Sequence, residues 1–486
     1  MIDISSPNQP TEQTRPRTSG NDDPESLAER AVAELPADFV WGAATSAYQI
    51  EGAVDADGRR PSIWDTFAAT PGKTWRGESG DPGCDHYHRY ADDVRLMAGL
   101  GLGAYRFSVA WPRIVPTGRG PANPAGLAFY DRLVDELLAA GIDPWITLYH
   151  WDLPQDLQDR GGWSERDTAQ HFADYSAIVA GALSDRVKHW STLNEPWCSA
   201  FLGHMSGRHA PGLQDPVITA RAVHHLLLGH GLAVAAVRAR GGKSVGITLN
   251  LIPAEPADDS LAARDAVRLV DGQQNRVFLD PLVHGRYPDD VIADFARAQA
   301  RLPVVGNDLQ VISAPLDWVG VNYYAPNIVA AGADRASPSP FIPGDAVIQS
   351  GSTENITALG WPVRPNSFGA LLRRLHTDYP GVPLYIHENG AAYHDAVSAD
   401  GSVDDPDRRG YIARHVDVLC AAVRDGVPVR GYFAWSLLDN YEWAEGYRMR
   451  FGLTHVDFAT QQRTLKSSAR WYGKLIRTHR DAHDAT

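Results

Sequence analysis

The sequence predicts an α/β fold, namely a single (β/α)8 TIM barrel with long βα loops. Strand-like runs and helical stretches alternate eight times between Phe39 and His479. Such alternation is typical of a parallel sheet. Eight units within a chain of 486 residues favour a closed barrel over an open, doubly wound sheet. No window of 18 apolar residues indicates a transmembrane helix.

The eight strands are expected at regular intervals along the chain. Their ranges are Phe39–Tyr48, Ala104–Trp111, Pro144–Tyr149, Val187–Leu193, Ser244–Leu251, Trp318–Tyr323, Pro383–His387 and Val429–Trp435. Helices are expected at 92–100, 124–140, 166–184, 217–240, 261–276, 366–378, 408–424 and 467–479. The 124–140 helix has the clearest ends, because Asn123 suits the N-cap, Pro124 the first helical position and Gly141 the C-terminus.

Composition sets the domain limits. Residues 1–35 are expected to form a disordered or weakly structured tail rich in Ser, Pro and Thr, with a short helix possible near its end. The barrel then spans 36–480, and residues 481–486 form a short C-terminal tail. The longest loop, about 325–360, is rich in Pro, Gly and Ser, which predicts an irregular segment able to cover a site.

Charge and cysteine content exclude several functions. The formal net charge of −14 disfavours nucleic-acid or membrane-surface partners. The three cysteines (Cys84, Cys198 and Cys420) form no CxxC pair, and the N-terminus lacks the pattern of a secretory signal, so a cytoplasmic protein is expected. His86 and His88 lack the partner spacing of a metal site, and no cofactor is predicted.

The 14 tryptophans are many for this length, and tryptophan both fills cores and stacks on sugars.

Polar and aromatic residues gather where the predicted strands end. The C-terminal ends of barrel strands are the place where barrel enzymes carry their chemistry. Six of the eight strands end in such residues, at Gln49 and Glu51, 149–152, 192–197, 322–324, 387–390 and 435–443. Solvated loops alone would not favour Trp and Tyr beside Glu and Asn so consistently.

Arg106 is a second, independent sign of a site. In the strand 104–111, Tyr105, Phe107 and their alternate neighbours form an apolar face that should meet the helices, so Arg106 points into the barrel. A buried guanidinium needs an anionic partner. The candidates at this end of the barrel are Glu195 and Glu388.

Two glutamates facing each other across a barrel mouth suit retaining glycoside hydrolysis, in which the carboxyl groups lie about 5–5.5 Å apart. The carboxylate beside Arg106 would stay ionised and attack the anomeric carbon. The other, close to that negative charge, would have a raised pKa and hold a proton for the leaving oxygen. Each glutamate taken alone could instead be a capping or salt-bridged carboxylate.

Seven motifs in order closely resemble glycoside hydrolase family 1, the retaining β-glucosidase family. They are FVWGAATSAYQIEG, YRFSVAWPRI, LYHWDLP, TLNEPW, VNYY, HENG and DNYEWAEGYRMRFGL, and the match runs from about Leu35 to His479. The resemblance implies the (β/α)8 barrel, with Glu195 as the acid/base and Glu388 as the nucleophile. It also implies that Arg106 and Tyr324 orient the nucleophile.

The resemblance further implies a sugar-binding set. Gln49, His150, Asn194, Trp435, Glu442 and Trp443 would hold the non-reducing sugar, and Trp197 and Trp361 would form platforms on the aglycone side. Trp151 and Asn322, which also lie at strand ends, complete the predicted substrate-binding residues. Trp111, Trp190 and Trp471 are expected to serve packing.

The chain departs from the commoner family pattern at His387, where threonine usually precedes the nucleophile. Strand alternation would place His387 on the opposite face from Glu388, which predicts an indirect effect. Cys198 is interpreted as a packing residue. Glu442-Trp443 stands where 6-phospho-β-glycosidases hold a phosphate, and a carboxylate there would repel that group.

The expected function is hydrolysis of terminal non-reducing β-D-glucosyl residues, with activity on β-fucosides and β-galactosides and transglycosylation as a variant. The expected substrates are β-glucosides and short β-linked oligosaccharides such as cellobiose, which would place the enzyme in polysaccharide and cellulose degradation. The alternative is a non-catalytic sugar-binding barrel. Such proteins keep the tryptophans but lose one carboxylate, and both carboxylates are present here.

Overall fold

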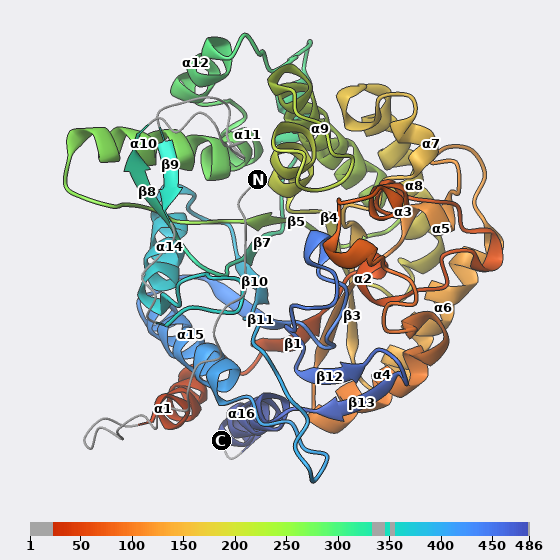
Figure 1. Cartoon of the computed structure of the whole chain (residues 1–486), viewed down its shortest axis with the longest axis vertical. Helices are drawn as coiled ribbons and strands as arrows, with labels where there is room; N and C mark the ends of the chain where they lie inside the picture. The colour runs from red at the N-terminus through yellow and green to blue at the C-terminus, as the bar shows by residue number, and fades with distance from the viewer. Residues whose placement is uncertain (1–22, 333–345, 350–354, 485–486) are drawn as a thin grey trace.

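The computed structural model describes residues 23–332, 346–349 and 355–484 and confirms the barrel. Eight strands form one closed sheet in the order β1-β11-β10-β7-β5-β4-β3-β2, and all neighbouring pairs are parallel. The helices surround this sheet (Figure 1). The barrel strands are β1 (Val40–Ala44), β2 (Ala104–Ser108), β3 (Asp143–Tyr149), β4 (His189–Asn194), β5 (Ser244–Asn250), β7 (Trp318–Asn322), β10 (Leu384–Asn389) and β11 (Val429–Trp435).

The longer helices follow the strands as expected for a βα repeat. They are α4 (His86–Leu100), α6 (Pro124–Ala139), α8 (Asp167–Leu183), α9 (Pro216–Ala239), α10 (Leu261–Asp271), α11 (Val277–His284), α12 (Asp289–Arg297), α14 (Pro365–Asp378), α15 (Pro406–Arg424) and α16 (Ser467–Asp484). The expected 261–276 helix divides into α10 and a π-helical turn, Gly272–Arg276. Of the described helices, only α9 is long and apolar enough to cross a membrane, and it is mostly buried against α8.

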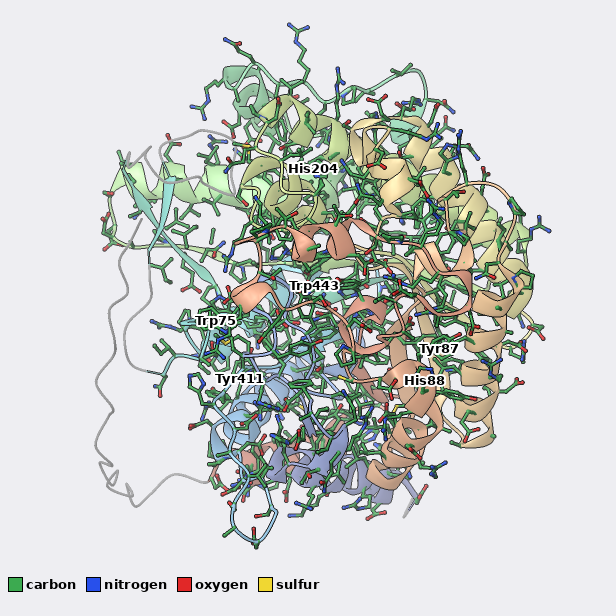
Figure 2. All side chains as sticks on the ribbon, turned by 45° about the vertical axis from the view of Figure 1, so that its right-hand side comes forward. Trp75, Tyr87, His88, His204, Tyr411 and Trp443 are labelled. Atoms are coloured by element: carbon green, nitrogen blue, oxygen red, sulfur yellow. The ribbon has the colours of Figure 1, made fainter. Side chains whose placement is uncertain are left out.

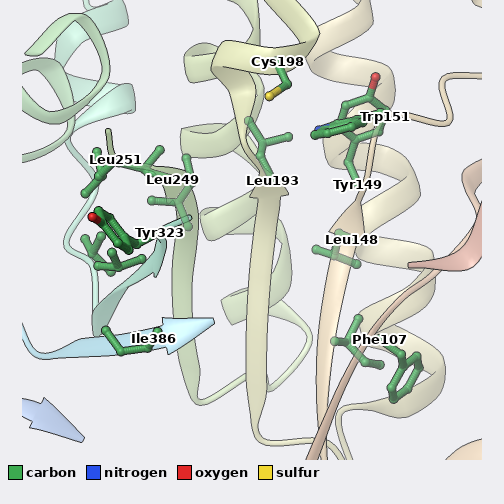
Figure 3. Packing of buried hydrophobic residues seen from close by; sticks show 14 of the residues in the cluster. Phe107, Leu148, Tyr149, Trp151, Leu193, Cys198, Leu249, Leu251, Tyr323 and Ile386 are labelled. Carbon is green, nitrogen blue, oxygen red and sulfur yellow. The ribbon is translucent and has the colours of Figure 1, made fainter. Parts of the chain in front are cut away.

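Strand alternation separates two buried layers. Side chains on the outward face, such as Leu148, Leu249 and Ile386, pack beneath the surrounding helices (Figure 3). The inward face carries rings instead. Trp145 stacks on His189 with ring centroids 3.8 Å apart and lies 5.3 Å from Phe433.

Several expected boundaries were wrong. The first two strands end at Ala44 and Ser108, because the chain turns into the short helices α2 (Ala47–Ile50) and α5 (Trp111–Ile114). The 325–360 segment contains β8 (Asn327–Ala331) and β9 (Ala346–Gln349), which form a three-stranded sheet with β6 (Ala254–Pro256) beside α10 (Figure 1). The rest of the irregular loop expected there lies partly outside the described residues, at 333–345 and 350–354.

Both terminal segments are more ordered than expected in the described residues, and the short helix expected near the end of the first one forms. Helix α1 (Pro24–Ala31) and the 3-10 turn Val32–Glu34 pack against α15 and α16, and Ala28 and Val32 are fully buried. Residues 1–22 lie outside the described part of the chain. At the other end, α16 continues to Asp484, so most of the expected 481–486 tail is helical. Its last turns are held by His479 and His483, whose ring nitrogens contact the Pro36 and Leu35 carbonyl oxygens.

Candidate active site

The pairing of Arg106 settles which glutamate it holds. Its Nη1 donates to Glu388 Oε1 at 2.6 Å, and its Nη2 donates to Asn194 Oδ1, also at 2.6 Å. The guanidinium is 1% exposed. Of the two partners left open by strand alternation, the ion pair therefore forms with Glu388, the one that the family resemblance implied. Tyr324 adds a second donor, from its hydroxyl to Glu388 Oε2 at 2.6 Å.

The two glutamates reach the mouth because β4 and β10 are irregular at their ends. The pairing of β4 with β5 shifts register between Ser191 and Asn194, and that of β10 with β7 shifts between Ile386 and Glu388. Such shifts re-aim side chains that strict alternation would place on one face. Glu195 and Glu388 are consequently both buried at the C-terminal ends of their strands, at 5% and 3% exposure.

Glu195 has different partners from Glu388. Asn322 Nδ2 donates to Glu195 Oε1 at 2.7 Å, and the Cys198 thiol donates to Oε2 with an Sγ–Oε2 distance of 3.2 Å. Burial, together with the negative charge of Glu388, raises the pKa of Glu195 to about 8. Burial also raises the pKa of Glu388, but Arg106 and Tyr324 oppose that rise. The pair is thus arranged for Glu388 to ionise first.

A third carboxyl group belongs to the same pocket. Glu442 follows β11, and its pKa is raised to about 8 by burial and by the charges of Glu388, Glu445 and Glu195. Within the described part of the chain, Glu442 Oε2 has no hydrogen-bond partner. A buried polar atom of this kind needs a partner, which a hydroxyl group could supply.

Most of the predicted sugar-binding residues lie together. His150 Nε2 pairs with Asn194 Nδ2 at 3.1 Å, and the His150 ring lies parallel to those of Trp435 and Trp443, with centroids 6.0 and 5.9 Å away. Trp151 Nε1 donates to the Asn194 carbonyl at 2.9 Å. The ring of Trp443 lies among the central loops (Figure 2), and its centroid is 4.5 Å from that of Trp151.

Gln49 is hydrogen-bonded to the loop that follows β11. It donates from Nε2 to the Tyr441 carbonyl at 2.8 Å and to Asn440 Oδ1 at 3.1 Å, and its Oε1 accepts from Ser46. These bonds fix the amide one residue away from Glu442. The structure therefore places Gln49 beside the segment that carries the third carboxyl group.

The backbone is strained at three of these positions. Trp151, Glu195 and Trp443 have φ angles of 72°, 47° and 52°, in the left-handed region that side chains other than glycine rarely adopt. Each such residue costs on the order of 1–3 kcal/mol, and residues of this kind cluster at functional sites. Glycine is needed at position 390 in the same region for a steric reason, because a Cβ there would lie 1.8 Å from the Trp435 carbonyl oxygen.

The two predicted aglycone platforms differ in exposure. Trp361 is 36% exposed, and its ring centroid lies 5.6 Å from that of Tyr324. Trp197 is buried and stacks on Phe201 at 5.6 Å. Trp361 is therefore the ring that an incoming group can reach, while Trp197 is held mainly by packing.

His387 does not lie where alternation predicted. The register shift after Ile386 turns both His387 and Glu388 inward, so the expectation of opposite faces was wrong. The His387 ring packs beneath the carboxylates against Trp318, with centroids 4.7 Å apart, and its Nδ1 pairs with Thr248 Oγ1 at 2.8 Å. Gly320 makes this possible, because a Cβ there would lie 2.5 Å from His387 Nδ1.

The structure also shows the surroundings of His86, His88 and Cys198, which the sequence singled out. His86 is buried against Asp93, with a 2.8 Å contact, and His88 pairs with Asp85 on the outer side of the barrel (Figure 2). Among the described residues, no group of three or more His, Cys, Asp or Glu side chains could hold a metal ion. Cys198, interpreted from the sequence as packing, contacts Glu195; its position three residues after that glutamate, on a helical turn, was the available signal.

Known proteins resemble this chain along most of its length. The family described as Glycosyl hydrolase family 1 matches residues 31–481. The chain belongs to this family. It is 53% identical over 444 residues to "Thermostable beta-glucosidase B" of Thermobispora bispora, covering 91% of this chain and 90% of that protein.

Two more relatives of this family-1 glycoside hydrolase are informative. A "Bifunctional beta-D-glucosidase/beta-D-fucosidase" of Bifidobacterium breve is 46% identical over 459 residues, covering 92% of this chain and 98% of the relative. The crystal structure of the psychrophilic beta-glucosidase BglU from Micrococcus antarcticus has a TM-score of 0.89 at 47% identity, covering 93% of this chain and 99% of the other.

Proposed function

We propose that this family-1 enzyme is a retaining β-glucosidase in which Glu388 is the nucleophile and Glu195 the acid/base. The unlike surroundings of the two buried carboxyl groups carry the proposal. Glu388 is held by a guanidinium and a phenol, and Glu195 by an amide and a thiol. That difference lets one carboxylate attack while the other holds a proton.

In the first step, Glu388 attacks the anomeric carbon and Glu195 gives its proton to the glycosidic oxygen. The carbon–oxygen bond to the aglycone breaks, the aglycone leaves as an alcohol, and the sugar is joined to Glu388 as an ester. Arg106 and Tyr324 keep the attacking oxygens in place. The raised pKa of Glu195 keeps its proton available at neutral pH.

In the second step, Glu195 acts as a base. Formation of the ester removes the negative charge of Glu388, which was one cause of the raised pKa of Glu195. Its pKa falls, so the carboxylate left by the first step takes a proton from water. The water oxygen attacks the anomeric carbon from the face opposite Glu388. The ester bond breaks, Glu388 leaves as a carboxylate, and the sugar is released with its original configuration.

We infer that the sugar is held by Glu442, Gln49, His150 and the rings of Trp435 and Trp443. Glu442 Oε2 and His150 Nδ1 have no partner within the described chain, so two sugar hydroxyls would supply one to each. The pocket also holds three carboxyl groups, which favours neutral sugars over phosphorylated ones. Trp361 would stack on the aglycone.

For substrates, we propose β-glucosides and short β-linked oligosaccharides such as cellobiose, with activity on β-fucosides, as the name of the Bifidobacterium relative suggests. A role in cellulose degradation follows from cellobiose as substrate. We also propose a cytoplasmic location, since the three cysteines are free and buried.

A covalent label tests the nucleophile. A 2-deoxy-2-fluoro-β-glucoside with a good leaving group should form a stable ester. The fluorine slows both steps, and the good leaving group speeds only the first, so the ester accumulates. Mass spectrometry of the digest should find the added mass on the peptide that contains Glu388. Labelling of another peptide, or turnover of glucosides without labelling, would contradict the assignment. Absence of all turnover would instead favour the non-catalytic barrel.

The acid/base is tested by varying the leaving group. Glu195→Gln should reduce hydrolysis of alkyl glucosides by about 10²–10⁴-fold, the usual contribution of general acid catalysis. The first step for a dinitrophenyl glucoside should be nearly unaffected, because that group leaves without a proton. A uniform loss across both substrates would exclude the acid role.

Retention is tested on the wild-type enzyme. Proton NMR of the first sugar product should show the β-anomer.

A further inference from the structure

Cys198 is the one thiol that touches a carboxyl group of the site in the described structure. It begins the π-helical turn Cys198–Met205 that follows β4. Its Sγ lies 3.2 Å from Glu195 Oε2, and Asn250 Nδ2 donates to the same sulfur at 3.5 Å. The side chain is 6% exposed. The sulfur thus sits between an amide on β5 and the carboxyl group of Glu195.

These contacts give the thiol a direction. The Asn250 amide hydrogen approaches the sulfur, so the thiol proton is left to point to Glu195 Oε2. Burial and the charge of Glu195 raise the pKa of the Cys198 thiol well above its usual value, so it remains protonated and can only donate to that carboxylate. The other carboxylate oxygen accepts from Asn322.

We propose that Cys198 is a positioning residue for the acid/base, its S–H bond holding Oε2 of Glu195 and favouring the carboxylate form. The proposal rests on the role of Glu195 given above. A donor that favours the carboxylate lowers the pKa of Glu195. The thiol therefore limits the rise that burial and Glu388 produce, and keeps the group able to act as a base in the second step.

The other groups around Glu195 remain when Cys198 is changed. Those that interact with its carboxyl group come from four other strands or the loops after them: Arg106 (β2), Asn322 and Tyr324 (β7), Glu388 (β10) and Glu442 (after β11). None of them touches the sulfur in the described structure. A change in the pH profile of a Cys198 variant can then be attributed to the lost S–H bond.

The choice of variant depends on a small cavity behind the thiol. A space of about 10 Å³ is lined by Cys198, Trp151, His204, His209 and neighbouring residues, close to the room that one water needs. Alanine would enlarge this space, and a water entering it could replace the lost donor. Valine fills the volume of the thiol with methyl groups and donates nothing. Serine keeps a donor of similar size.

The test is the pH dependence of kcat/KM for an alkyl β-glucoside. In Cys198→Val, the pKa of Glu195 should rise, so the basic limb of the profile should move to higher pH by about half a unit. At a pH above the limb, the variant should then keep a share of its maximal activity about threefold larger than the wild type does. In Cys198→Ser, the limb should stay at or below the wild-type position. Cys420→Val, at a buried cysteine on α15 away from the site, should leave the profile unchanged.

Two outcomes would overturn the proposal. One is a Cys198→Val profile that superimposes on the wild type, and the other is a loss of activity that is equal at every pH. Either outcome can occur while the activity of Glu195→Gln still depends on the leaving group, and the proposed function would then stand without the role of Cys198. If the activity of Glu195→Gln did not depend on the leaving group, the proposed function and the role of Cys198 would both lose their basis.

Infrared spectroscopy of the wild type decides the matter if Cys198→Val does not fold. The S–H stretching band of Cys198, isolated by subtracting the Cys198→Ser spectrum, should lie at the low frequency of a hydrogen-bonded thiol. At a pH above the basic limb, where Glu195 is a carboxylate, the band should shift to higher frequency in Glu195→Gln, whose amide is a weaker acceptor. A band at the position of a free thiol, or one insensitive to Glu195→Gln, would contradict the inference.

Discussion

Inside the barrel, the same strands carry two layers of side chains. The lower layer, here called the floor, consists of packed aromatic rings, and the upper layer, here called the mouth, consists of charged groups at the C-terminal ends of the strands. On the floor, Trp145, Trp318 and Phe433 pack together with the stacked His189. At the mouth, Arg106 and Glu388 form a buried ion pair. The register shifts that bring Glu195 and Glu388 to the mouth lie at the ends of β4 and β10. A further shift, between Leu384 and Tyr385, lies in the floor, where Tyr385 packs against Trp145. The two layers thus differ in the side chains that they carry and not in the regularity of the sheet.

The largest effect should come from the mouth. Glu388→Gln replaces the attacking carboxylate by an uncharged and far weaker nucleophile, so kcat/KM on an aryl β-glucoside should fall by about 10⁴-fold or more. The fold should persist, because the amide oxygen can still accept from Arg106. Circular dichroism and a thermal melt check the fold. Activity within tenfold of wild type would mean that the mouth does not carry the chemistry.

Arg106→Met tests the support of that carboxylate. The guanidinium lowers the pKa of Glu388, so its loss should raise that pKa and move the acid limb of the kcat/KM profile to higher pH, with a fall of about 10²–10³-fold at neutral pH. Arg408→Met is the matched control, since Arg408 is also buried and paired with Asp395 and Asp405. It should lower stability without moving the acid limb. A shift in both variants would point to a global effect.

The floor should respond in stability. Trp145→Ala leaves a large cavity among packed rings and should reduce the free energy of unfolding by about 3–5 kcal/mol, with kcat/KM changed only a few-fold. Urea unfolding followed by tryptophan fluorescence measures the first, and an aryl glucoside assay the second. Trp435→Ala, one layer higher, should reverse the order, with a large loss of activity. Equal effects on activity would erase the distinction between floor and mouth.

His387→Thr should have the smallest effect, because His387 lies between the two layers. Burial and Arg106 lower the pKa of this imidazole well below its usual value, so it is neutral across the working range. Its replacement should leave both limbs of the pH profile in place and cost about 1–2 kcal/mol for the gap above Gly320 and the lost bond to Thr248. A shifted acid limb would show that His387 influences Glu388 directly.

The parts that the sequence predicted well follow simple periodicity. Eight alternating units gave the barrel, and the inward direction of Arg106 followed from the alternation of its strand. Alternation alone left Glu195 and Glu388 open as partners of Arg106, and only the family resemblance pointed to Glu388. The placement of His387 failed for a related reason, since a register shift leaves no mark in hydrophobic periodicity. Cys198 was missed because a lone thiol resembles a packing residue until its neighbour in space is known.

The expected loop at 325–360 shows another limit. Its content of Pro, Gly and Ser predicted irregular structure, yet β8 pairs with β6, about 70 residues earlier in the chain. Non-local pairing of a short segment is set by its partner and not by its own composition. Most of the predicted site residues were easier to find because they lie in the seven ordered motifs; Trp361 and Trp435 lie outside them.

Contacts at the ends of the fold bear on how the enzyme can be attached to something else. His479 and His483 of α16 reach the backbone just before β1 begins, at the opposite end of the strands from the mouth. The C-terminal end of α16 therefore lies beside the segment that leads into β1, at the base of the barrel. A fused module or a solid support joined through the end of α16 would face the base, and glucosides could still diffuse into the open side.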